Sequence, residues 1–188
     1  MALLTESGVR ALARRAELVK SAESTRRADA QTSQGSYDIF LSHAFRDREV
    51  ILGTKRYIQD MGYSVYVDWI DDRSLDRGAV TTYTATVLKT RMKNCKCLLF
   101  ATSENSEESK WMPWELGFKD GQNGLVAILP IVRNENAPYR GQEYLGIYPY
   151  IDICEGRLDG RVRLWVNDAS DSYVDLDSWL KGKAPTKR

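Results

Sequence analysis

The stretch SKWMPWELGFKDG, residues 109–121, holds an aromatic and an acidic side chain at a spacing suited to chemistry. Trp111 and Glu115 are four residues apart, so they share one face of a helix that begins near Trp111. An indole face attracts a planar cation, and a carboxylate near a sugar carbon stabilises the charge that develops as a glycosidic bond breaks. The alternative is structural, because an early glutamate stabilises the helix dipole and tryptophans beside Pro113 pack in the core. Spacing alone leaves both interpretations open.

The other candidates for chemistry carry weaker signals. His43 has no serine or cysteine nucleophile at a fixed spacing, so a packed or hydrogen-bonded histidine accounts for it better than a general base. Cys95 and Cys97 straddle a helix-to-strand junction, which predicts buried thiols on opposite faces and not a metal or redox pair. The stretch DDRSLDR, residues 71–77, lacks the glycine of a calcium loop and fits a mobile charged lid. No glycine-rich phosphate-binding motif is present.

Composition restricts the class of protein. The 188 residues suffice for one domain with its own core plus an appendage. Twenty-seven basic and 26 acidic residues give a net charge of +1, which favours neither nucleic acid nor an anionic membrane as a partner. Three cysteines without a CxxC pair, and a single histidine, argue against a metal site or a disulfide framework. Because the chain has neither a long apolar span nor a secretory signal, we expect a cytoplasmic protein.

From residue 37 onward, short apolar runs alternate with longer segments of helical period. The predicted strands are 37–43, 63–69, 96–102, 125–132 and 148–153, and the predicted helices between them are 46–62, 80–95 and 111–119. Strands that alternate with helices form right-handed crossovers, which predicts a parallel sheet with helices on both faces. The expected fold class is therefore α/β.

The two ends of the chain fall outside this alternation. Residues 1–35 are predicted to form an amphipathic, arginine-containing helix and a polar linker, with the helix packed on the domain or on another subunit. Residues 156–188 are predicted to form an extension that packs on the domain. Within it, residues 161–166 fit an edge strand or an extended arm. Residues 172–182 are predicted to form a closing helix, and residues 183–188 a frayed tail.

Ligands of an open parallel sheet bind at the carboxyl ends of its strands. Three loops of this chain should meet at that rim: the loop after 37–43, the loop after 63–69, and the loop that leads into Trp111 and Glu115. The first two loops bring to the rim the side chains of Ser42, His43, Phe45, Arg46, Trp69, Asp72 and Arg77. This rim is the predicted site.

Three stretches, in this order and spacing, resemble the boxes of the Toll/interleukin-1 receptor (TIR) domain family, especially its stand-alone, Thoeris-like bacterial members. They are YDIFLSHAFRD, YSVYVDWIDDRSLDRGA and KCLLFATSENSEESKWMPWEL. The resemblance covers residues 36–155 and identifies them as the domain core. It implies a flavodoxin-like fold with a five-stranded parallel sheet, and a loop after the second strand that gates a nucleotide pocket.

The resemblance also implies an activity. Many enzymatic TIR domains cleave the nicotinamide–ribose bond of NAD+, releasing nicotinamide and ADP-ribose or a cyclic isomer, with NAD+ as a substrate and no cofactor. The family's catalytic glutamate falls on Glu115, and the tryptophan four residues before it falls on Trp111. The rim residues after the first strand would then line the adenine or ribose side of the pocket, and Trp69, Asp72 and Arg77 would form its lid.

The same resemblance implies partners. Stand-alone bacterial members commonly act in anti-phage defence, where a nucleotide product activates a separate effector, and TIR domains also self-associate. Two alternatives remain open: a non-catalytic scaffold that acts by self-association, and an enzyme similar to nucleoside deoxyribosyltransferases, which also use a carboxylate at a glycosidic carbon. Trp111 and Glu115 in register favour an enzyme. Trp114 is predicted to be a packing residue.

Overall fold

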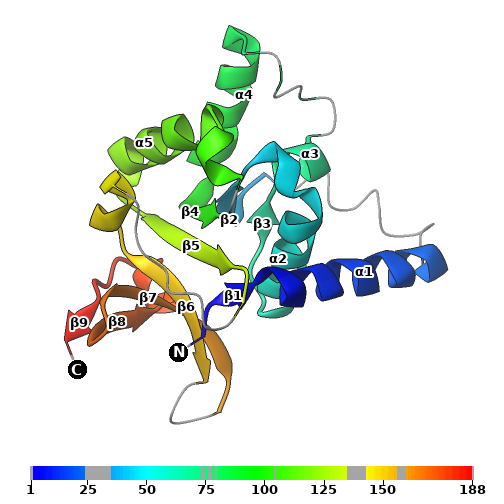
Figure 1. Ribbon diagram of the computed structural model, residues 1–188. Coiled ribbons are helices and arrows are strands. Elements are labelled where there is room, and N and C mark those ends of the chain that lie inside the picture. The colour runs from blue at the N-terminus through cyan, green and yellow to red at the C-terminus, as the bar shows by residue number, and fades with distance from the viewer. Residues whose placement is uncertain are drawn as a thin grey trace.

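Five parallel strands form the centre of the molecule (Figure 1). The computed structural model describes residues 2–23, 35–72, 75, 78, 80–103, 105–134, 143–155 and 160–187. The parallel strands lie in the order β3-β2-β4-β5-β6. Their bounds are Tyr37–Ser42 (β2), Val65–Tyr66 (β3), Cys95–Thr102 (β4), Val126–Val132 (β5) and Tyr150–Glu155 (β6). The predicted α/β class is confirmed.

Helices cover both faces of this sheet, as a parallel sheet of apolar strands requires. One face carries α1 (Glu6–Glu23), α2 (Arg48–Asp60) and α3 (Asp68–Asp71), and the other carries α4 (Thr82–Lys93) and α5 (Trp111–Asn123) (Figure 1). Short 3₁₀ helices are η1 (Phe45–Asp47), η2 (Ser106–Glu108) and η3 (Glu143–Ile147). Successive strand residues point to opposite faces, so Leu99 of β4 joins the core layer under α2 while Leu98 and Phe100 join the layer under α5.

Beyond β6 the sheet continues with antiparallel strands. The first of them contains residues 161–166, for which an edge strand was one of the two predicted alternatives, and the other two were not predicted. β7 (Val162–Ala169) pairs with β6, β8 (Ser172–Asp175) pairs with β7, and β9 (Thr186–Lys187) pairs with β8. Alternate apolar residues of β7 and β8 extend the core layer of α1 and α2. Within the described residues the sheet thus has nine strands, and β6 is not its edge.

The closing helix predicted for 172–182 is wrong in its first half, which is strand β8. The Asp175 side chain accepts the N–H of Ser178 at 2.9 Å and so caps a short helix, α6 (Leu176–Trp179). Thr186 pairs with Tyr173, so the tail that was predicted to fray adds a short edge strand.

β3 is shorter than the predicted strand 63–69. Asp71 Oδ2 accepts the N–H of Val67 at 2.6 Å, and Asp68 Oδ1 accepts the N–H of Trp69 at 2.7 Å. Because these aspartates satisfy backbone donors locally, the chain leaves the sheet and α3 begins at Asp68. Trp69 therefore lies on a helix and not on a strand.

α5 is longer than predicted, since it continues past Lys119 to Asn123. Gly121 is accommodated within the helix, and Gly124, with a φ of 66°, ends it in the left-handed conformation that glycine adopts without strain. The second glycine of the DGQNG stretch, and not the first, is the stop signal.

The N-terminal segment is part of the sheet. β1 (Leu4–Thr5) pairs in parallel with the end of β5, and Ala2 forms an antiparallel bridge to Ile153 of β6. β5 and β6 themselves are paired only at Ile128 and Tyr150. The segment therefore fills the gap that opens where these two strands diverge.

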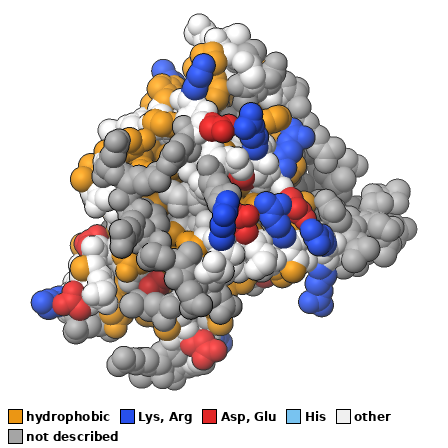
Figure 2. Space-filling view, in the orientation of Figure 1, with side chains coloured by type: hydrophobic (Ala, Val, Ile, Leu, Met, Phe, Trp, Pro, Cys, Tyr) orange, Lys and Arg blue, Asp and Glu red, His pale blue; other side chains and the backbone are white. Residues whose placement is uncertain are grey.

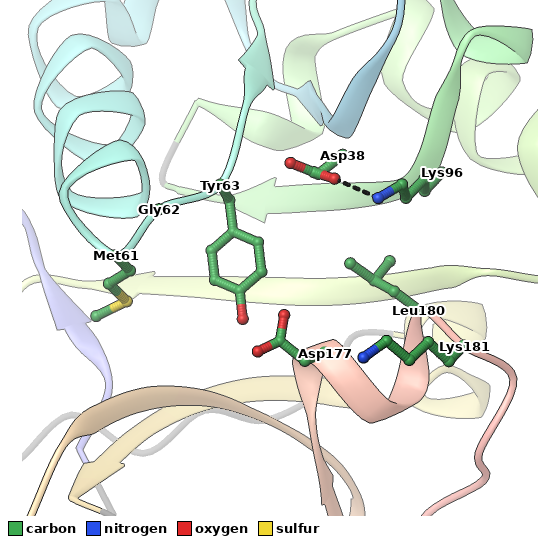
Figure 3. Close-up of a pocket in the computed structure, with 8 residues that line it drawn as sticks. All are labelled: Asp38, Met61, Gly62, Tyr63, Lys96, Asp177, Leu180 and Lys181. Atoms are coloured by element: carbon green, nitrogen blue, oxygen red, sulfur yellow. Dashed lines mark ion pairs between the residues drawn. The ribbon is translucent and has the colours of Figure 1, made fainter.

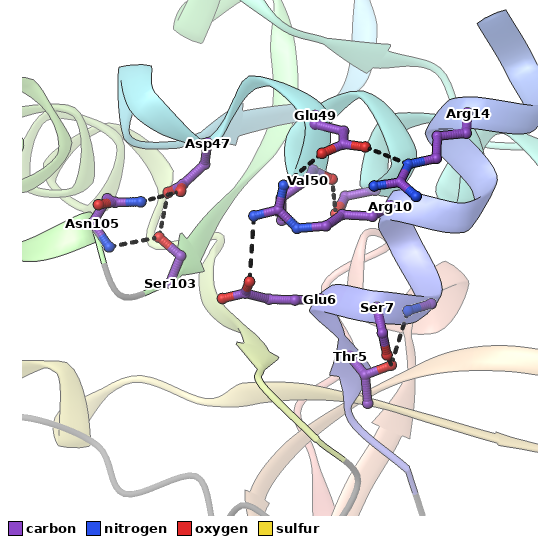
Figure 4. Close-up of polar contacts among 12 residues, drawn as sticks. Thr5, Glu6, Ser7, Arg10, Arg14, Asp47, Glu49, Val50, Ser103 and Asn105 are labelled. Carbon is purple, nitrogen blue, oxygen red and sulfur yellow. Dashed lines mark hydrogen bonds and ion pairs between the residues drawn. The ribbon is translucent and has the colours of Figure 1, made fainter.

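Helix α1 continues from β1 and packs against α2. Val9 and Ala13 of α1 are buried. Arg10 and Arg14 donate to the Glu49 carboxylate of α2 at 2.6 and 3.0 Å (Figure 4). The polar linker predicted after this helix lies outside the described residues for positions 24–34.

Charged side chains of both signs are interleaved on the face of the molecule seen in Figure 2. Ion pairs of the molecule include Arg10 with Glu49 and Arg46 with Glu108, each 2.6 Å apart. Neighbouring opposite charges cancel at a distance, so this face does not present a field of one sign. In the described part of the chain, no helix combines the length and apolarity needed to cross a membrane.

Candidate active site

Helix α5 places three side chains on one stripe. Trp111, Glu115 and Lys119 are spaced four residues apart, so they share a face of the helix. Pro113 stands in the first turn, where its missing N–H breaks no helical hydrogen bond. Glu115 lies beyond the first turn and is 0% exposed. Stabilisation of the helix dipole therefore does not account for this carboxylate.

The Glu115 carboxylate receives a hydrogen bond from the end of β2. Ser42 Oγ donates to Glu115 Oε2 at 2.6 Å, and both residues are 0% exposed. Ser42 is the last residue of β2 and points toward α5, because Leu41 before it points into the core layer under α2. The fold thus places a hydroxyl against a carboxylate at the carboxyl end of a central strand, and this contact is the centre of the candidate site.

Lys119 fixes α5 on the molecule. Its Nζ donates to the carbonyls of Met92 and Cys95 at 2.9 and 2.6 Å and to Gln122 Oε1 at 3.2 Å. These three acceptors match the three protons of an ammonium group, so Lys119 needs no ion pair with Glu115. Burial lowers the pKa of Lys119. Because the Met92 carbonyl belongs to the unpaired last turn of α4, Lys119 joins α5 to the end of α4.

The aromatic side chains of α5 form one half-buried group that packs on the core layer under α4 and α5. Trp114 stacks on Phe118 with ring centroids 6.0 Å apart, and Lys89 Nζ lies 5.8 Å from the Trp114 centroid. Trp111 meets Trp114 edge to face at 5.4 Å and is half-buried. Trp114 is a packing residue, as predicted. Trp111 lies one helical turn before Glu115 and packs on the same core layer.

His43 and Trp69 lie on the other face of the sheet from Glu115. His43 follows Ser42 in the chain and therefore points the opposite way. Its Nδ1 donates to the Leu41 carbonyl at 2.8 Å, and its Nε2 accepts the Trp69 indole N–H at 3.1 Å. The Asp68 carboxylate also lies 3.5 Å from Nε2. Since His43 is 1% exposed, it holds α3 against β2 in this conformation and does not line an open pocket.

Phe45 and Arg46 lie at the surface of the rim. Phe45 is 55% exposed, and the Arg48 guanidinium lies 4.5 Å from its ring centroid and 5.2 Å from that of Trp69. Arg46 pairs with Glu108 of η2 at 2.6 Å. Sequence reasoning did not single out Arg48, although a cation three residues after an aromatic side chain on a helix start is a recognisable signal.

Asp72, the second residue of the predicted lid, is anchored to α4. Asp72 accepts two hydrogen bonds from Arg91, each 2.7 Å long, and one from the Tyr66 hydroxyl at 2.6 Å. Burial opposes ionisation of Asp72, but the Arg91 and Tyr66 donors together hold its pKa below its usual value. Asp72 thus ties the loop to the domain through a bidentate ion pair. Arg77 lies outside the described residues.

A polar network that sequence reasoning missed joins the loops after β2 and β4 (Figure 4). Ser103 Oγ donates to Asp47 Oδ2, and Asn105 Nδ2 donates to Asp47 Oδ1. Asp47 is 5% exposed, so the network is covered by the rim. The available signal was an aspartate soon after the first strand combined with a Ser-x-Asn sequence after the third. The network holds two of the three predicted rim loops together.

A polar hollow of about 490 Å³ opens at the opposite end of the sheet (Figure 3). Its floor carries the ion pair between Asp38 and Lys96, 2.7 Å apart, and the Tyr63 ring forms one wall with its hydroxyl toward Asp177. Asp38 and Lys96 lie at the amino ends of β2 and β4. The hollow is therefore separated from Glu115 by the length of the sheet and is not part of the candidate site.

Thiol chemistry is not supported by the positions of the cysteines. Cys95 belongs to the core layer under α4 and α5, and Cys97 belongs to the other layer, as predicted. Burial raises the pKa of Cys95 to about 12, which leaves it unreactive as a thiolate near neutrality. Across the described residues, no three His, Cys, Asp or Glu side chains are grouped so as to hold a metal ion.

Comparison with known proteins identifies the family. Residues 39–165 match the family described as TIR domain, and this match spans most of the chain. The chain belongs to the TIR domain family. Ser42, Trp111 and Glu115 all lie within the matched part of this TIR domain, which begins inside β2 and ends inside β7.

Two bacterial TIR-type relatives carry names that state an activity. The chain is 50% identical over 148 residues to the probable 3' cyclic ADP-D-ribose synthase ThsB' of Bacillus cereus (strain MSX-D12), which covers 77% of this chain and 76% of that protein. It is 37% identical over 83 residues to the putative cyclic ADP-D-ribose synthase TIR2 of Cytobacillus dafuensis, covering 44% of this chain and 22% of that protein. The first similarity extends over most of both proteins.

Proposed function

We propose that this TIR protein cleaves the nicotinamide–ribose bond of NAD+ and closes the ADP-ribosyl group into a cyclic ADP-ribose isomer. The family and the names of the two relatives support this substrate and product. One observation carries the assignment of the site: the Glu115 carboxylate, fully buried, is held by Ser42 at the carboxyl end of β2 and lies one helical turn after Trp111.

In this mechanism the bond between ribose C1′ and the nicotinamide nitrogen breaks, and both electrons move to the ring, which leaves as neutral nicotinamide. Glu115 stabilises the positive charge that develops on the ribose. The half-buried Trp111 ring receives the planar cationic ring before it leaves. A hydroxyl group of the same molecule then attacks C1′ and loses its proton, which gives the cyclic product, whereas attack by water gives ADP-ribose.

Access to the carboxylate requires movement of the rim. Glu115 and Ser42 are both 0% exposed, so the substrate reaches Glu115 only after the side chains that cover it move. The loop after β3 is suited to this role, because it is anchored at one end by Asp72 and Arg91. We assign the described conformation to the closed state of the enzyme.

The rim residues then have different roles. Phe45 and Arg46 are at the surface and are suited to contact the adenine or ribose side of NAD+. His43 and Trp69 bind each other and support the loop from the opposite face of the sheet. Asp72 acts as the anchor of the lid and contacts Arg91 in place of the substrate.

The test is mass spectrometry of the products formed from NAD+ by the wild type and by Glu115→Gln and Glu115→Ala. We expect nicotinamide and a cyclic isomer from the wild type and neither from the two variants, with unchanged circular dichroism. The matched control is Glu155→Gln, which removes an exposed carboxylate at the end of β6 and should retain full activity. Wild-type turnover by a folded Glu115→Gln protein would show that another group acts on the glycosidic bond.

The same experiment separates the alternatives. A non-catalytic scaffold gives no product from NAD+, even at high protein concentration. An enzyme similar to deoxyribosyltransferases exchanges bases between free deoxynucleosides and leaves NAD+ intact. Chromatography against standards identifies the isomer, for which the name of the Bacillus cereus relative indicates the 3' form.

We further infer that the protein is cytoplasmic, that it self-associates, and that its product activates a separate effector in anti-phage defence. The observation that favours self-association is apolar exposure at the start of α4, where Val80 and Tyr83 are 73% and 71% exposed. Light scattering after size-exclusion chromatography should show an oligomer that Tyr83→Asp weakens. A wild-type protein that stays monomeric at all concentrations would contradict this part of the proposal.

A further inference from the structure

Ser42 occupies a position where the neighbouring residues are apolar. On the face of the sheet that packs under α5, its strand partner is Phe100 and the next residue across is Ile128. The preceding residue of β2 on the same face is Phe40, which is also buried. A hydroxyl group is unfavourable in such a layer unless it is hydrogen-bonded. The Ser42 hydroxyl is therefore stable in this layer only because of the group to which it is hydrogen-bonded.

That group is the carboxylate of Glu115, 2.6 Å from Ser42 Oγ. An ionised carboxylate only accepts hydrogen bonds, so the single hydroxyl proton of Ser42 is donated to Glu115. A short O–H···O⁻ contact of this kind is charge-assisted and stronger than a bond between neutral groups. Because both residues are 0% exposed, water does not compete for either one in this conformation.

We propose that Ser42 is a positioning residue, which orients the Glu115 carboxylate and keeps it ionised, and that it is not primarily a contact for the substrate. The inference rests on the function proposed for Glu115. Burial in an apolar layer favours the protonated form of a carboxyl group, and a hydrogen bond donated to the charged form opposes this effect. The charged form is the one that stabilises a developing ribosyl cation, so the Ser42 hydroxyl contributes to the rate through Glu115.

The polar residues next to this pair, His43 in the chain and Lys119 on the helix, contact other groups. His43 has both ring nitrogens engaged on the other face of the sheet, with the Leu41 carbonyl and the Trp69 indole. Lys119, the buried cation on the same stripe of α5, is engaged by Met92, Cys95 and Gln122. Both of these polar neighbours therefore hold other groups, and Ser42 is the residue whose hydroxyl is donated to Glu115 in this pair.

The decisive measurement is the pH dependence of kcat and kcat/KM for NAD+ in the wild type and in Ser42→Ala. Loss of the donor makes the carboxylate easier to protonate, so the acidic limb of the profile should move to higher pH by about one to two units. We expect kcat at its optimum to fall by about 10- to 100-fold and KM to change by less than about threefold, since the substrate contacts remain. Ser42→Thr, which keeps the hydroxyl, should restore the position of the acidic limb.

The matched control is Thr54→Val. Thr54 is also 0% exposed and donates its hydroxyl to the Val50 carbonyl at 2.8 Å, but it lies on α2 across the sheet. This variant loses a buried hydroxyl bond of the same kind, so it should lower the melting temperature and leave the pH profile unchanged. The comparison separates a general effect of destabilisation from an effect on Glu115.

The outcomes are distinguishable. A folded Ser42→Ala protein with the acidic limb of the wild type overturns the inference, as does a large rise in KM with unchanged kcat, which would make Ser42 a substrate contact. If Ser42→Ala does not fold, Ser42→Cys replaces it as the test. A thiol is similar in size to a hydroxyl but is a weaker hydrogen-bond donor, so the acidic limb of the Ser42→Cys profile must lie at higher pH than that of the wild type. Full activity of Glu115→Gln would refute the proposed function itself, whatever the Ser42 variants show.

Discussion

Three buried charged side chains differ in how well they are hydrogen-bonded: Lys119, Glu115 and Asp152. Lys119 donates to three acceptors, and Glu115 receives the Ser42 hydroxyl. Asp152 of β6 is 2% exposed, and within the described residues neither of its carboxylate oxygens has a hydrogen-bond partner. The neighbouring Asn167 amide is committed to the carbonyls of Tyr150 and Trp165. A buried carboxylate without donors destabilises the fold.

Asp152→Asn should therefore stabilise the protein at neutral pH. Burial raises the pKa of Asp152, and the nearby Asn167 amide offsets only part of this effect. A carboxyl group with a raised pKa binds its proton more tightly in the folded state, so stability falls as pH rises from the unfolded value of about 3.9 through the folded value. We expect a gain of about 1–2 kcal/mol in the free energy of unfolding at pH 7 and no gain near pH 3.

Urea denaturation of both proteins at pH 7 and pH 3 measures this difference. Asp168→Asn is the control, since Asp168 lies in β7 but is exposed, and its substitution should change stability at neither pH. If Asp152→Asn were less stable than the wild type at pH 7, the carboxylate would have a stabilising partner beyond the described residues.

At the scale of helices and strands, the sequence predicts those elements whose apolar residues recur at a regular spacing. The parallel strands and the helices α2, α4 and α5 were predicted because their apolar residues recur at the period of a strand or helix. β3 was predicted too long, since side-chain hydrogen bonds from Asp68 and Asp71 end it, and period does not report such bonds. β8 and β9 were missed because their pairing is set by β7 and not by their own short sequences.

The site was predictable to a similar extent. The spacing of Trp111 and Glu115 predicted that they share one face of α5, and the rule for the carboxyl ends of strands predicted that Ser42 lies at the same rim. Sequence reasoning grouped Ser42 with His43, although successive residues of a strand must face opposite sides of the sheet. The partners of Asp72 and Lys119 depend on which carbonyls and guanidinium groups tertiary packing brings near, so no local signal identifies them.

The crossing of α1 over α2 depends on one glycine. A Cβ atom built on Gly53 of α2 would lie 1.8 Å from the carbonyl oxygen of Val9 in α1, a distance that no packed atoms tolerate. Gly53→Ala should therefore destabilise the protein by about 2–3 kcal/mol, because the backbone of α1 must move and the added helix propensity recovers less than about 1 kcal/mol. Thermal unfolding of the variant beside the wild type measures the change.

Gly121→Ala is the matched control for this helix crossing. Gly121 is also inside a helix, but a Cβ atom there meets no atom within 4 Å. Alanine should raise stability at this position by up to about 1 kcal/mol, so the two substitutions are expected to have opposite signs. A Gly53→Ala protein as stable as the wild type would show that α1 does not hold its place on α2 in solution.

At the scale of the whole molecule, the N-terminal segment links parts that are distant in the sequence. β1 and Ala2 fill the gap between β5 and β6, and α1 then crosses to α2. The core layer under α2 includes Leu4 and Val9, which are 7% and 1% exposed, and Ala13 of α1 is also buried. The segment therefore behaves as part of one cooperative fold and not as an independent arm.

Deletion of residues 1–23 should accordingly lower the melting temperature of the protein by roughly 10–20 °C. Burial of the apolar side chains of β1 and α1 accounts for about 4–6 kcal/mol, and each kilocalorie corresponds to about 2–4 °C for a chain of this size. Deletion of residues 183–188, which removes the exposed strand β9, should shift the melting temperature by less than about 3 °C. Calorimetry of the two truncated proteins decides between a structural and a dispensable N-terminal segment. If both deletions melt like the full chain, the segment is dispensable for the fold, and its contact with Glu49 through Arg10 is a surface ion pair of little energetic value.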